Sequence, residues 1–474
     1  MCTVGDEDVG ENSYMQPKTK SPVSNICRKC NENRAEVVLR KKHPYCRLCF
    51  VQAATHKFRA TLGKSKIIRA GDNVMIAFSG SEASAALVHL VSVGLNEGNH
   101  KRLCFNPIIL YVDEGCILGL SRDERKNVSD AINRSLETYR LPTYMTSLEA
   151  FFNTQELNCC KLGTEMSLSV ENEERLHKLF NQVKSLTSKE ELLKILRFKI
   201  LRRAAKSLNC SKIFVADTAT GLATTLLTNV SLGRGVHLPL DVGFCDDTDN
   251  NLLILRPMRD FMKKEIIFYN VFNKVSGVHI PSIVTKVSSN QSIQKLTEKF
   301  VMELQQDYPS TASVVFRTGE KLSMPRDIKL SNETCSLCEA PLDDRNMKSS
   351  SLQATEFSRL ASHLGPSGFS ADSIMSDSYS VKNNFSSEIK EECQSESADK
   401  VDCSSFTDGC DCQHKCSPDM KICISDAEKC FCYSCRIILK ELGSVEVLPQ
   451  EVQTKIRNQL SFRNMRKEIA DFLL

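Results

Sequence analysis

The stretch Asp72–Leu95 reads DNVMIAFSGSEASAALVHLVSVGL and decides the fold. Val74–Phe78 is a short apolar run, which is typical of a strand buried in a parallel sheet. A loop of small residues follows, and the apolar run Ala85–Leu95 predicts a buried helix. Backbone N–H groups and the helix dipole at such a junction favour an anion. An ordinary tight turn between a strand and a helix has the same composition, so this alternative stays open.

Two later stretches repeat the pattern. Asn106–Asp113 predicts a strand followed by Glu114-Gly115, and Lys212–Asp217 predicts a strand that runs into a loop of Thr, Ala and Gly. Alternating elements continue, with helices expected at Arg122–Thr138, Glu191–Leu208 and Met258–Asn273 and strands at Pro142–Thr146 and Leu252–Leu255. This order predicts an α/β fold with a doubly wound parallel sheet. A basic helix and linker are expected earlier, over Thr55–Ala70, and residues 275–330 are expected to pack against the sheet.

The bulk composition limits the class of protein. A chain of 474 residues with 41% hydrophobic residues predicts two or three domains. No apolar run reaches 18 residues, and the acidic start (Asp6, Glu7, Asp8 and Glu11) does not resemble a secretory signal. We therefore expect a protein of the cytosol or nucleus, without a membrane partner. In such a compartment the 22 cysteines indicate reduced thiols and metal ligands rather than disulfides.

Composition shifts along the chain predict five parts. We expect a disordered leader at 1–24, a basic metal-binding segment at 25–70, the α/β domain at 71–330 and a disordered insertion at 343–409. Residues 331–342 and 410–474 are expected to form a C-terminal cysteine knuckle with a closing amphipathic helix from Val452, whose apolar positions are Ile456, Leu460, Ile469 and Leu473.

Cysteine pairs predict two metal centres. Cys27 and Cys30 are followed, after fifteen residues, by Cys46 and Cys49, a spacing that fits tetrahedral zinc with a structural role. A redox dithiol is the alternative, although it needs one such pair and not two.

A second set of cysteine pairs lies far apart in the sequence. Cys335 and Cys338 are expected to pair with Cys432 and Cys435, since a loop of 93 residues adds little closure entropy. Competing ligands remain, and they are Cys410, Cys412, His414 and Cys416.

Charge is concentrated near the N-terminus. Arg28–Arg69 contains twelve Lys and Arg against two acids, a net +10 in a chain of net +4, so the remainder carries −6. This predicts contact with a polyanion such as a nucleic acid, and aromatic residues are so sparse that phosphate contact is expected rather than base stacking. A merely solvated surface is the alternative. The candidate residues are Lys41, Lys42, Lys57, Arg59, Lys64, Lys66 and Arg69. A second basic group on a predicted helix (Lys199, Arg202, Arg203 and Lys206) fits an RNA path or a solvated face equally well.

The three strand-and-loop stretches resemble the PP-loop (N-type ATP pyrophosphatase) superfamily, whose loop reads SGGxDS. Within it, the chain is most similar to the second-subunit branch of the cytosolic thiouridylase family. The resemblance covers about Cys27–Arg259 and resumes at the C-terminal cysteines and last helix. It implies work on tRNA, where the 2-oxygen of the wobble uridine is adenylated with ATP and replaced by sulfur from a thiocarboxylated ubiquitin-like carrier. The product is 5-methoxycarbonylmethyl-2-thiouridine.

The match to the active loop is partial. Ser79, Gly80 and Ser84 occupy the first Ser, first Gly and last Ser of the motif. Ser81 replaces the second glycine and adds a Cβ beside the phosphate position. Ala83 replaces the aspartate, which removes a group expected to organise Mg²⁺.

Other active-site groups of the family are also missing. Ala216–Gly221 stands where catalytic subunits carry Gly-His-x-x-Asp-Asp, so both acids are lost. Ile195 and Phe198 stand where active subunits carry a Cys-x-x-Cys pair before Arg-Arg. Cys159 and Cys160 are adjacent and lack a base that would stabilise a thiolate.

These departures favour a non-catalytic or weakly catalytic subunit that forms a heterodimer with an active PP-loop thiouridylase, and they disfavour binding of ATP and Mg²⁺ by this subunit. Structural zinc is expected from the two sets of cysteine pairs. The first alternative is a working ATP-dependent tRNA sulfurtransferase in which acids such as Asp113 and Glu114 substitute for the missing ones. The second alternative is a zinc-knuckle scaffold that binds protein alone.

Overall fold

In this computed structural model the described residues are 25–39, 43–96, 102–153, 157, 159–164, 166, 168–249, 251–285, 287–324, 333–342, 355, 359 and 422–469. Their contacts separate two units, one within Met1–Lys329 and Val447–Gln450 and the other within Leu330–Glu446 and Glu451–Leu474. The expected leader at 1–24 lies outside the described residues. So does the expected insertion at 343–409, apart from Thr355 and Arg359, and the assignments of both stay predictions.

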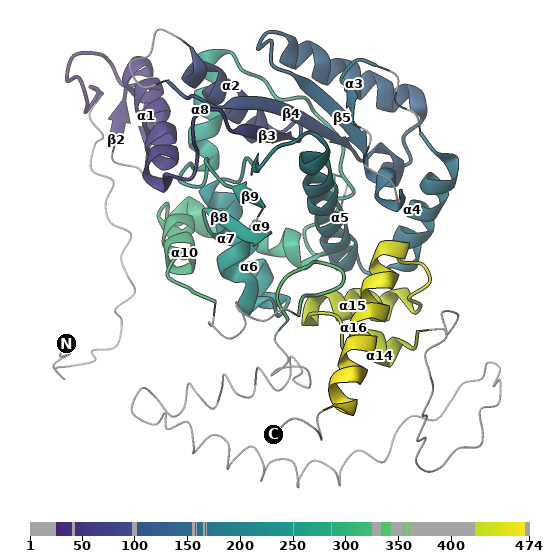
Figure 1. Ribbon diagram of the computed structural model, residues 1–474. Helices are drawn as coiled ribbons and strands as arrows, with labels where there is room; N and C mark the ends of the chain where they lie inside the picture. The colour runs from purple at the N-terminus through teal and green to yellow at the C-terminus, as the bar shows by residue number, and fades with distance from the viewer. Residues whose placement is uncertain are drawn as a thin grey trace, which may run out of the picture. The chain divides into compact units, whose positions relative to one another are not determined.

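A seven-stranded sheet is the centre of the first unit, with the strand order β6-β5-β4-β3-β7-β9-β8 (Figure 1). The five inner strands run parallel, and they are β3 (Asn73–Phe78), β4 (Asn106–Asp113), β5 (Thr143–Ser147), β7 (Lys212–Phe214) and β9 (Leu252–Leu255). The edge strands β6 (Cys160–Lys161) and β8 (Cys245–Asp249) are antiparallel. The predicted α/β fold with a parallel sheet is confirmed, and the two antiparallel edges are an addition to it.

Strand order reverses at the middle of the sheet. The chain passes from β3 outward through β4 to β5, and then returns to β7 on the other side of β3. In open α/β sheets, ligands bind beyond the carboxyl ends of the strands at such a reversal. The loop after Phe78 and the residues after Phe214 therefore share the position where a ligand would be expected.

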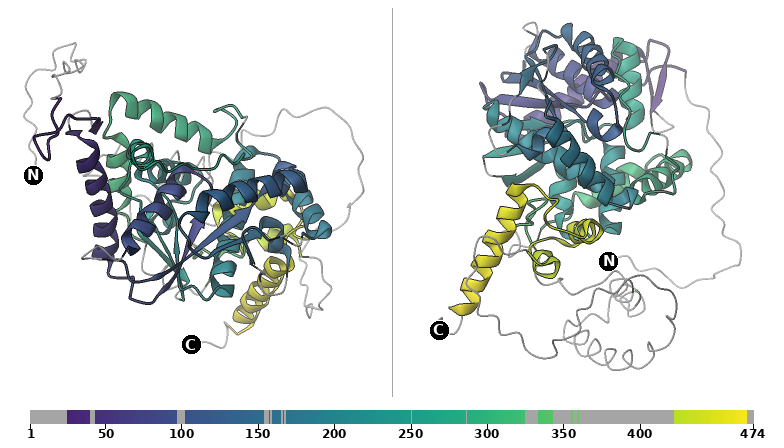
Figure 2. Two further views of the ribbon diagram at one scale, coloured as in Figure 1. Left: turned by 90° about the horizontal axis from the view of Figure 1, so that it is seen from above. Right: turned by 90° about the vertical axis from the view of Figure 1, so that its right-hand side faces the viewer.

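Helices surround this sheet, and Figure 2 follows them from two further sides. In chain order they are α1 (Arg47–Ser65), α2 (Glu82–Leu95), α3 (Arg122–Glu137), α4 (Val170–Gln182), α5 (Leu186–Ser207), α6 (Ala219–Ser231), α7 (Leu238–Val242), α8 (Lys263–Asn273), α9 (Ile293–Asp307) and α10 (Thr311–Gly319). Short 3-10 turns occur at Gly115–Leu118, Leu148–Phe152 and Gly235–His237. Helices α1, α2 and α8 pack on one another, and α5 packs on β4, β7 and β9.

Three predicted boundaries need correction. Helix α1 begins at Arg47, directly after Cys46, although a helix was expected only from Thr55. Helix α5 begins at Leu186, where Ser185 accepts a hydrogen bond from the backbone N–H of Ser188 as an N-cap. Helix α8 begins at Lys263 and not at Met258, because the residues before it form turns in which Phe261 N–H donates to Met258 O at 2.9 Å.

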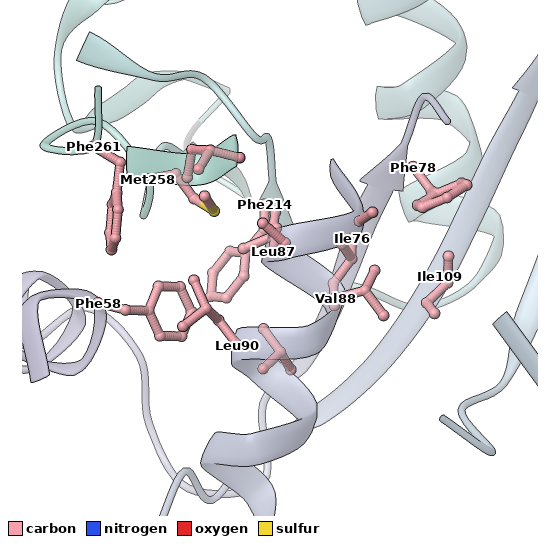
Figure 3. Packing of buried hydrophobic residues seen from close by; sticks show 14 of the residues in the cluster. Phe58, Ile76, Phe78, Leu87, Val88, Leu90, Ile109, Phe214, Met258 and Phe261 are labelled. Atoms are coloured by element: carbon pink, nitrogen blue, oxygen red, sulfur yellow. The ribbon is translucent and has the colours of Figure 1, made fainter. Parts of the chain in front are cut away.

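The main core lies between β3 and the α1, α2 and α8 group. Alternate residues of β3 (Val74, Ile76 and Phe78) belong to this core, which follows from the two-residue period of a strand. Phe58 of α1 and Phe214 of β7 reach the same cluster, and Figure 3 shows both beside the α2 residues that fill the space above the sheet. The loop after β3 is thus fixed by a strand and a helix that are both anchored in one core.

Residues 275–330 were expected to pack against the sheet, and this is a further correction. Helices α9 and α10 pack mainly against α6, and with α7 they form a separate apolar cluster that includes Val301 and Phe316. A two-stranded hairpin, β1 (Val37–Leu39) and β2 (His43–Tyr45), lies N-terminal to α1.

The second unit is small and helical. It contains α14 (Ile424–Glu428), α15 (Tyr433–Leu442) and α16 (Gln450–Glu468) together with residues 333–342, which form a bridge between Thr334 and Pro341. Of the expected apolar positions, Ile456 is fully buried and Leu460 is half-buried. The expected pattern fails at Ile469, which is 49% exposed and lies beyond the end of α16, while Leu473 lies outside the described residues.

Candidate nucleotide loop and metal centres

The loop after β3 has the geometry of a strand-to-helix turn. Gly80 has φ +75°, a left-handed conformation that favours glycine. Ser81 caps α2, and its Oγ accepts a hydrogen bond from the backbone N–H of Ser84 at 3.3 Å. Ser79 Oγ lies 3.0 Å from Ser81 Oγ. The residues predicted to form the loop (Ser79, Gly80, Ser81 and Ser84) are therefore together, although part of the capping potential of the helix is used by Ser81 itself.

A distant segment of the chain lies directly against this loop. The backbone N–H of Val278 donates to Gly80 O at 2.8 Å. A Cβ placed on Gly80 would come within 2.5 Å of Ile280 Cδ1 and 2.8 Å of Val278 O, and a Cβ on Gly277 would come within 2.6 Å of Gly80 O. The two glycines permit this close approach, and the space beside Gly80 is occupied by the protein's own residues.

Glu82 places a carboxylate at the first turn of α2. Its side chain accepts hydrogen bonds from Asn270 Nδ2 at 2.6 Å and from the backbone N–H of Gly277 at 3.1 Å. A carboxylate is a favourable partner for the positive end of a helix dipole. Glu82 therefore places a negative charge in the first turn of α2, and its two hydrogen bonds direct the carboxylate towards α8 and the segment that follows it.

The acids at the carboxyl ends of neighbouring strands are all paired with arginine. Glu114 is held by Arg197 through two hydrogen bonds of 2.5 and 2.9 Å, and Asp217 lies 3.1 Å from Arg256 Nε. Asp113 accepts from Arg125 Nε at 2.6 Å, in a buried group where Arg125 also bonds Glu149 and Glu173 at 2.5 and 3.0 Å. These carboxylates already have cationic partners, which lowers their capacity to bind Mg²⁺.

Two further predicted departures can be located. Ile195 is buried in α5, and Phe198 is half-buried on the same helix. Burial raises the pKa of the Cys159 thiol to about 11 and also raises the pKa of Cys160. Neither thiol is activated as a nucleophile, because a low pKa is what supplies thiolate at neutral pH.

The N-terminal cysteines converge. The sulfurs of Cys27, Cys30, Cys46 and Cys49 all lie within 4.8 Å of one another, and Cys30 Sγ and Cys46 Sγ are 3.9 Å apart. A tetrahedral zinc site with Zn–S bonds of about 2.3 Å has sulfurs about 3.8 Å apart, so the donor set fits a metal ion.

The environment of these thiols is uneven. Burial raises the pKa of Cys27, but backbone hydrogen bonds from Cys30, Cys46 and Lys29 outweigh it and lower the pKa to about 6. Burial raises the pKa of Cys49 to about 12, and the adjacent sulfurs act in the same direction. Four thiolates at this separation repel one another, so a bound cation is required to deprotonate all four.

The C-terminal cysteines converge in the same way. The sulfurs of Cys335, Cys338, Cys432 and Cys435 lie within 4.8 Å of one another, with Cys338 Sγ and Cys432 Sγ 3.7 Å apart. The predicted pairing across the long insertion is confirmed as a group that can hold a metal. The competing ligands Cys410, Cys412, His414 and Cys416 lie outside the described residues.

Comparison with known proteins identifies the family. The family model described as cytoplasmic tRNA 2-thiolation protein 2 matches residues 292–437. Over 529 aligned residues the chain is 33% identical to cytoplasmic tRNA 2-thiolation protein 2-A of Xenopus laevis, covering 100% of this chain and 99% of that protein. The Mus musculus protein 2 is 31% identical, with coverage of 100% and 99%. The chain belongs to the cytoplasmic tRNA 2-thiolation protein 2 family.

Solved structures with some likeness to this member of the tRNA 2-thiolation protein 2 family share little sequence with it. The U34-tRNA thiolase NcsA of Methanococcus maripaludis, solved with its 4Fe–4S cluster, is 16% identical with a TM-score of 0.48, over 69% of this chain and 95% of that one. An NH3-dependent NAD synthetase of Campylobacter jejuni is also 16% identical, with a TM-score of 0.28, over 58% and 97%. Within the described residues, no helix has the length and apolar character needed to cross a membrane.

The basic residues predicted to contact tRNA divide into four groups. Lys64, Lys66 and Arg69 are exposed, whereas Arg59 is half-buried. Lys57 forms an ion pair with Glu265 at 2.9 Å, so its charge is largely committed within the protein. Lys41 and Lys42 lie outside the described residues.

The second basic group on α5 contacts neighbouring elements of the protein, although the side chain of Lys206 is 61% exposed. The choice between an RNA path and a solvated face stays a prediction. Lys199 is buried, and Arg202 forms an ion pair with Asp246 at 2.9 Å. Arg203 donates to the carbonyl oxygens of Phe151 and Asn153, and Lys206 lies 2.8 Å from Asp249 Oδ2. These side chains bind neighbouring elements, because the strands and turns beside α5 present acids and carbonyls to them.

The site also contains residues that sequence reasoning did not single out. Glu82, Asn270 and Gly277 form the hydrogen-bonded group at the start of α2. A signal for Glu82 exists in the sequence, since it is the acidic residue at the variable position of the motif. The contacts of Asn270 and Gly277 span 188 and 195 residues and have no local signal.

Proposed function

We propose that this chain is a subunit of a cytoplasmic tRNA thiolation complex, required for 2-thiolation of the wobble uridine and not itself the catalyst. It would form a heterodimer with an active PP-loop thiouridylase, which takes sulfur from a thiocarboxylated ubiquitin-related carrier. The names of its relatives state tRNA 2-thiolation and the cytoplasm. The proposal extends these two properties to this chain.

One observation supports the non-catalytic assignment: the acidic groups that would organise Mg²⁺ and ATP at the loop are absent or paired. In addition, Val278 packs against Gly80, and Glu82 adds a carboxylate to the first turn of α2. Ala83 offers no Mg²⁺ ligand, and Glu114 and Asp217 are bound to arginines. The alternative of an independent sulfurtransferase needs these acids to be free.

Zinc is the metal we propose for both cysteine clusters. Four cysteine donors with no open position are typical of structural zinc, and both clusters supply four sulfurs at tetrahedral separation. In this proposal the zinc stabilises the fold of the segment around each cluster and takes no part in sulfur transfer.

The proposal is tested by complementation in cells that lack this protein, with 2-thiouridine at the wobble position measured by mass spectrometry of purified tRNA. We expect thiolation to be absent without the protein and restored by the wild-type chain. A Ser79→Ala variant should restore it fully, because Ser79 Oγ only contacts neighbouring serines. Loss of thiolation in a stably folded Ser79→Ala protein would favour a working loop.

Gly80 is unsuited to this test. Any side chain at Gly80 collides with Val278 and Ile280 and adopts an unfavourable φ of +75°. A Gly80→Glu variant would therefore lose activity through misfolding under either hypothesis, and Ser79 is the informative position.

A further inference from the structure

A cavity of about 680 Å³ lies where the N-terminal cysteine segment meets α1 and the start of α8. Its walls come from the first cysteine knuckle, the β1–β2 hairpin, one side of α1, and Phe261 with Glu265. Hairpin strand β2 and helix α1 are drawn next to each other in Figure 1. The volume is in the range of sites that hold a single small molecule or one nucleotide, which is about 300 to 1,000 Å³.

The charge of the lining favours an anion. It includes the cations Arg28, Lys29 and Lys57 and one acid, Glu265. Glu265 is bound to Lys57, whose Nζ lies 2.9 Å from both carboxylate oxygens, so this pair is nearly neutral. The exposed Arg28 and Lys29 then leave the rim positive, and His43 and His56 complete its polar part.

The remaining lining is apolar and partly aromatic. Tyr45 is half-buried, while Phe50 and Phe261 are almost fully buried at 3% and 1% exposure. Leu39 and two alanines of α1 contribute the rest of the apolar surface. An apolar, aromatic wall beneath a cationic rim matches the two halves of a nucleotide, a flat base and a phosphate.

We propose that this cavity takes one unpaired nucleotide of an RNA strand, with the base against Tyr45 and a phosphate beside Arg28 and Lys29. The inference rests on the proposed function, in which this chain contacts tRNA, and it adds a defined site to that contact. It also changes the expectation from the sequence that this segment binds phosphates without base stacking. A base-paired duplex does not fit, because its bases are not free to enter.

The metal centre supports this site directly. Arg28 and Lys29 are the two residues between Cys27 and Cys30, and Tyr45 precedes Cys46. Backbone bonds tie the same residues together, since Arg28 N–H donates to Pro44 O at 2.9 Å. The three residues that would touch the nucleotide are therefore positioned by the fold that holds the four sulfurs.

The first experiment uses the full chain, a single-stranded oligouridylate and an RNA duplex of equal length, with affinity measured by fluorescence anisotropy. Tyr45→Leu should weaken binding of the single strand about tenfold and leave duplex binding unchanged, because it removes one stacking surface. Tyr45→Phe should bind like the wild type. Arg28→Gln should weaken binding and reduce the salt slope by about one.

A matched control separates the cavity from general electrostatics. Arg34→Gln removes the same charge from the same exposed segment but lies outside the cavity lining, so it should change affinity less than twofold. Equal effects of the two arginine variants, or an unchanged affinity for Tyr45→Leu, would overturn the site. If the wild-type chain binds no RNA at all, both this site and the tRNA contact in the proposed function are wrong. The role in thiolation is tested separately, by the measurement of 2-thiouridine in complemented cells.

A direct readout is available because the chain contains no tryptophan. Tyr45→Trp introduces a single indole, and its fluorescence should be quenched when oligouridylate binds. Quenching by polyglutamate and not by RNA would show an acidic protein ligand and contradict the inference. If this variant does not fold, 2-aminopurine placed in the oligonucleotide reports stacking with the wild-type chain, and unchanged 2-aminopurine fluorescence on binding would contradict the inference as well.

Discussion

The acids at the carboxyl ends of the strands beside the loop are paired with arginines, and this distinguishes the site from an open nucleotide-binding loop. Arg125 is 5% exposed and binds three acids, of which Asp113 and Glu149 are equally buried. Buried charges are stable only when every one of them has a partner. The same residue that neutralises Asp113 therefore also joins β4 to the turn after β5 and to α4.

Replacing this arginine should be costly for stability. Arg125→Met leaves buried carboxylates without a cation, and we expect the free energy of unfolding to fall by about 3–5 kcal/mol. Arg175→Met is the control, because its pair with Glu171 on α4 is exposed and should contribute less than about 1 kcal/mol. Urea denaturation of both variants measures the difference, and equal losses would contradict the role given to Arg125.

Asp72 offers a pH-dependent test at the same scale. Burial raises the pKa of Asp72, but the hydrogen bond with Lys212 and the backbone N–H of Arg69 outweigh this effect and lower the pKa below 3.8. A carboxyl group whose pKa is lower in the folded state than in the unfolded state stabilises the fold at pH values above its unfolded-state pKa. This stabilisation is lost as the pH falls through the folded-state pKa. Asp72→Asn should thus be less stable than the wild type by about 1 kcal/mol at pH 7, and the gap should close towards pH 3. A gap of constant size across this range would contradict the assignment.

Elements were predictable where the local sequence carries the signal. Val74–Phe78 and Asn106–Asp113 have apolar runs, so β3 and β4 could be located from composition alone. Strand β8 reads CDDTD and has no such run, because it forms by pairing with the edge of β9. The position of a strand that depends on its neighbour is not written in its own residues.

The cysteine clusters, the loop and α5 show the same contrast between local sequence signals and contacts that are distant in the sequence. Cysteine spacing located both pairs of each cluster, whereas the hydrogen bond between Val278 and Gly80 joins residues almost two hundred positions apart in the sequence. The basic residues of α5 fitted an RNA path or a solvated face equally well from the sequence. Two of them, Arg202 and Lys206, form ion pairs with Asp246 and Asp249, which follow later in the chain.

Metal content tests the prediction that each cysteine cluster binds one zinc ion. The purified wild-type chain should contain two equivalents of zinc per chain, measured by inductively coupled plasma mass spectrometry. Cys27→Ser and Cys335→Ser should each lose about one equivalent and expose their own segment to proteolysis, because bound metal supplies folding free energy to small segments. Cys104→Ser, an exposed cysteine outside both clusters, should retain two. Retention of full metal content by Cys27→Ser and Cys335→Ser would contradict the two tetrathiolate centres.

At the scale of the whole molecule, the parallel sheet retains a strand reversal where related folds bind ligands, and the loop stands at that point. The groups that would hold ATP there are absent or engaged, and the charged surface is concentrated in the N-terminal segment. The proposed non-catalytic role rests on these features together.

The most direct measurement of the central claim is ATP–pyrophosphate exchange by the isolated chain in the presence of tRNA, with an active PP-loop thiouridylase as positive control. The account predicts no exchange above the rate without protein, because Ala83 offers no Mg²⁺ ligand and the neighbouring acids Glu114 and Asp217 are paired with arginines. Exchange at a rate comparable to the active enzyme would contradict it.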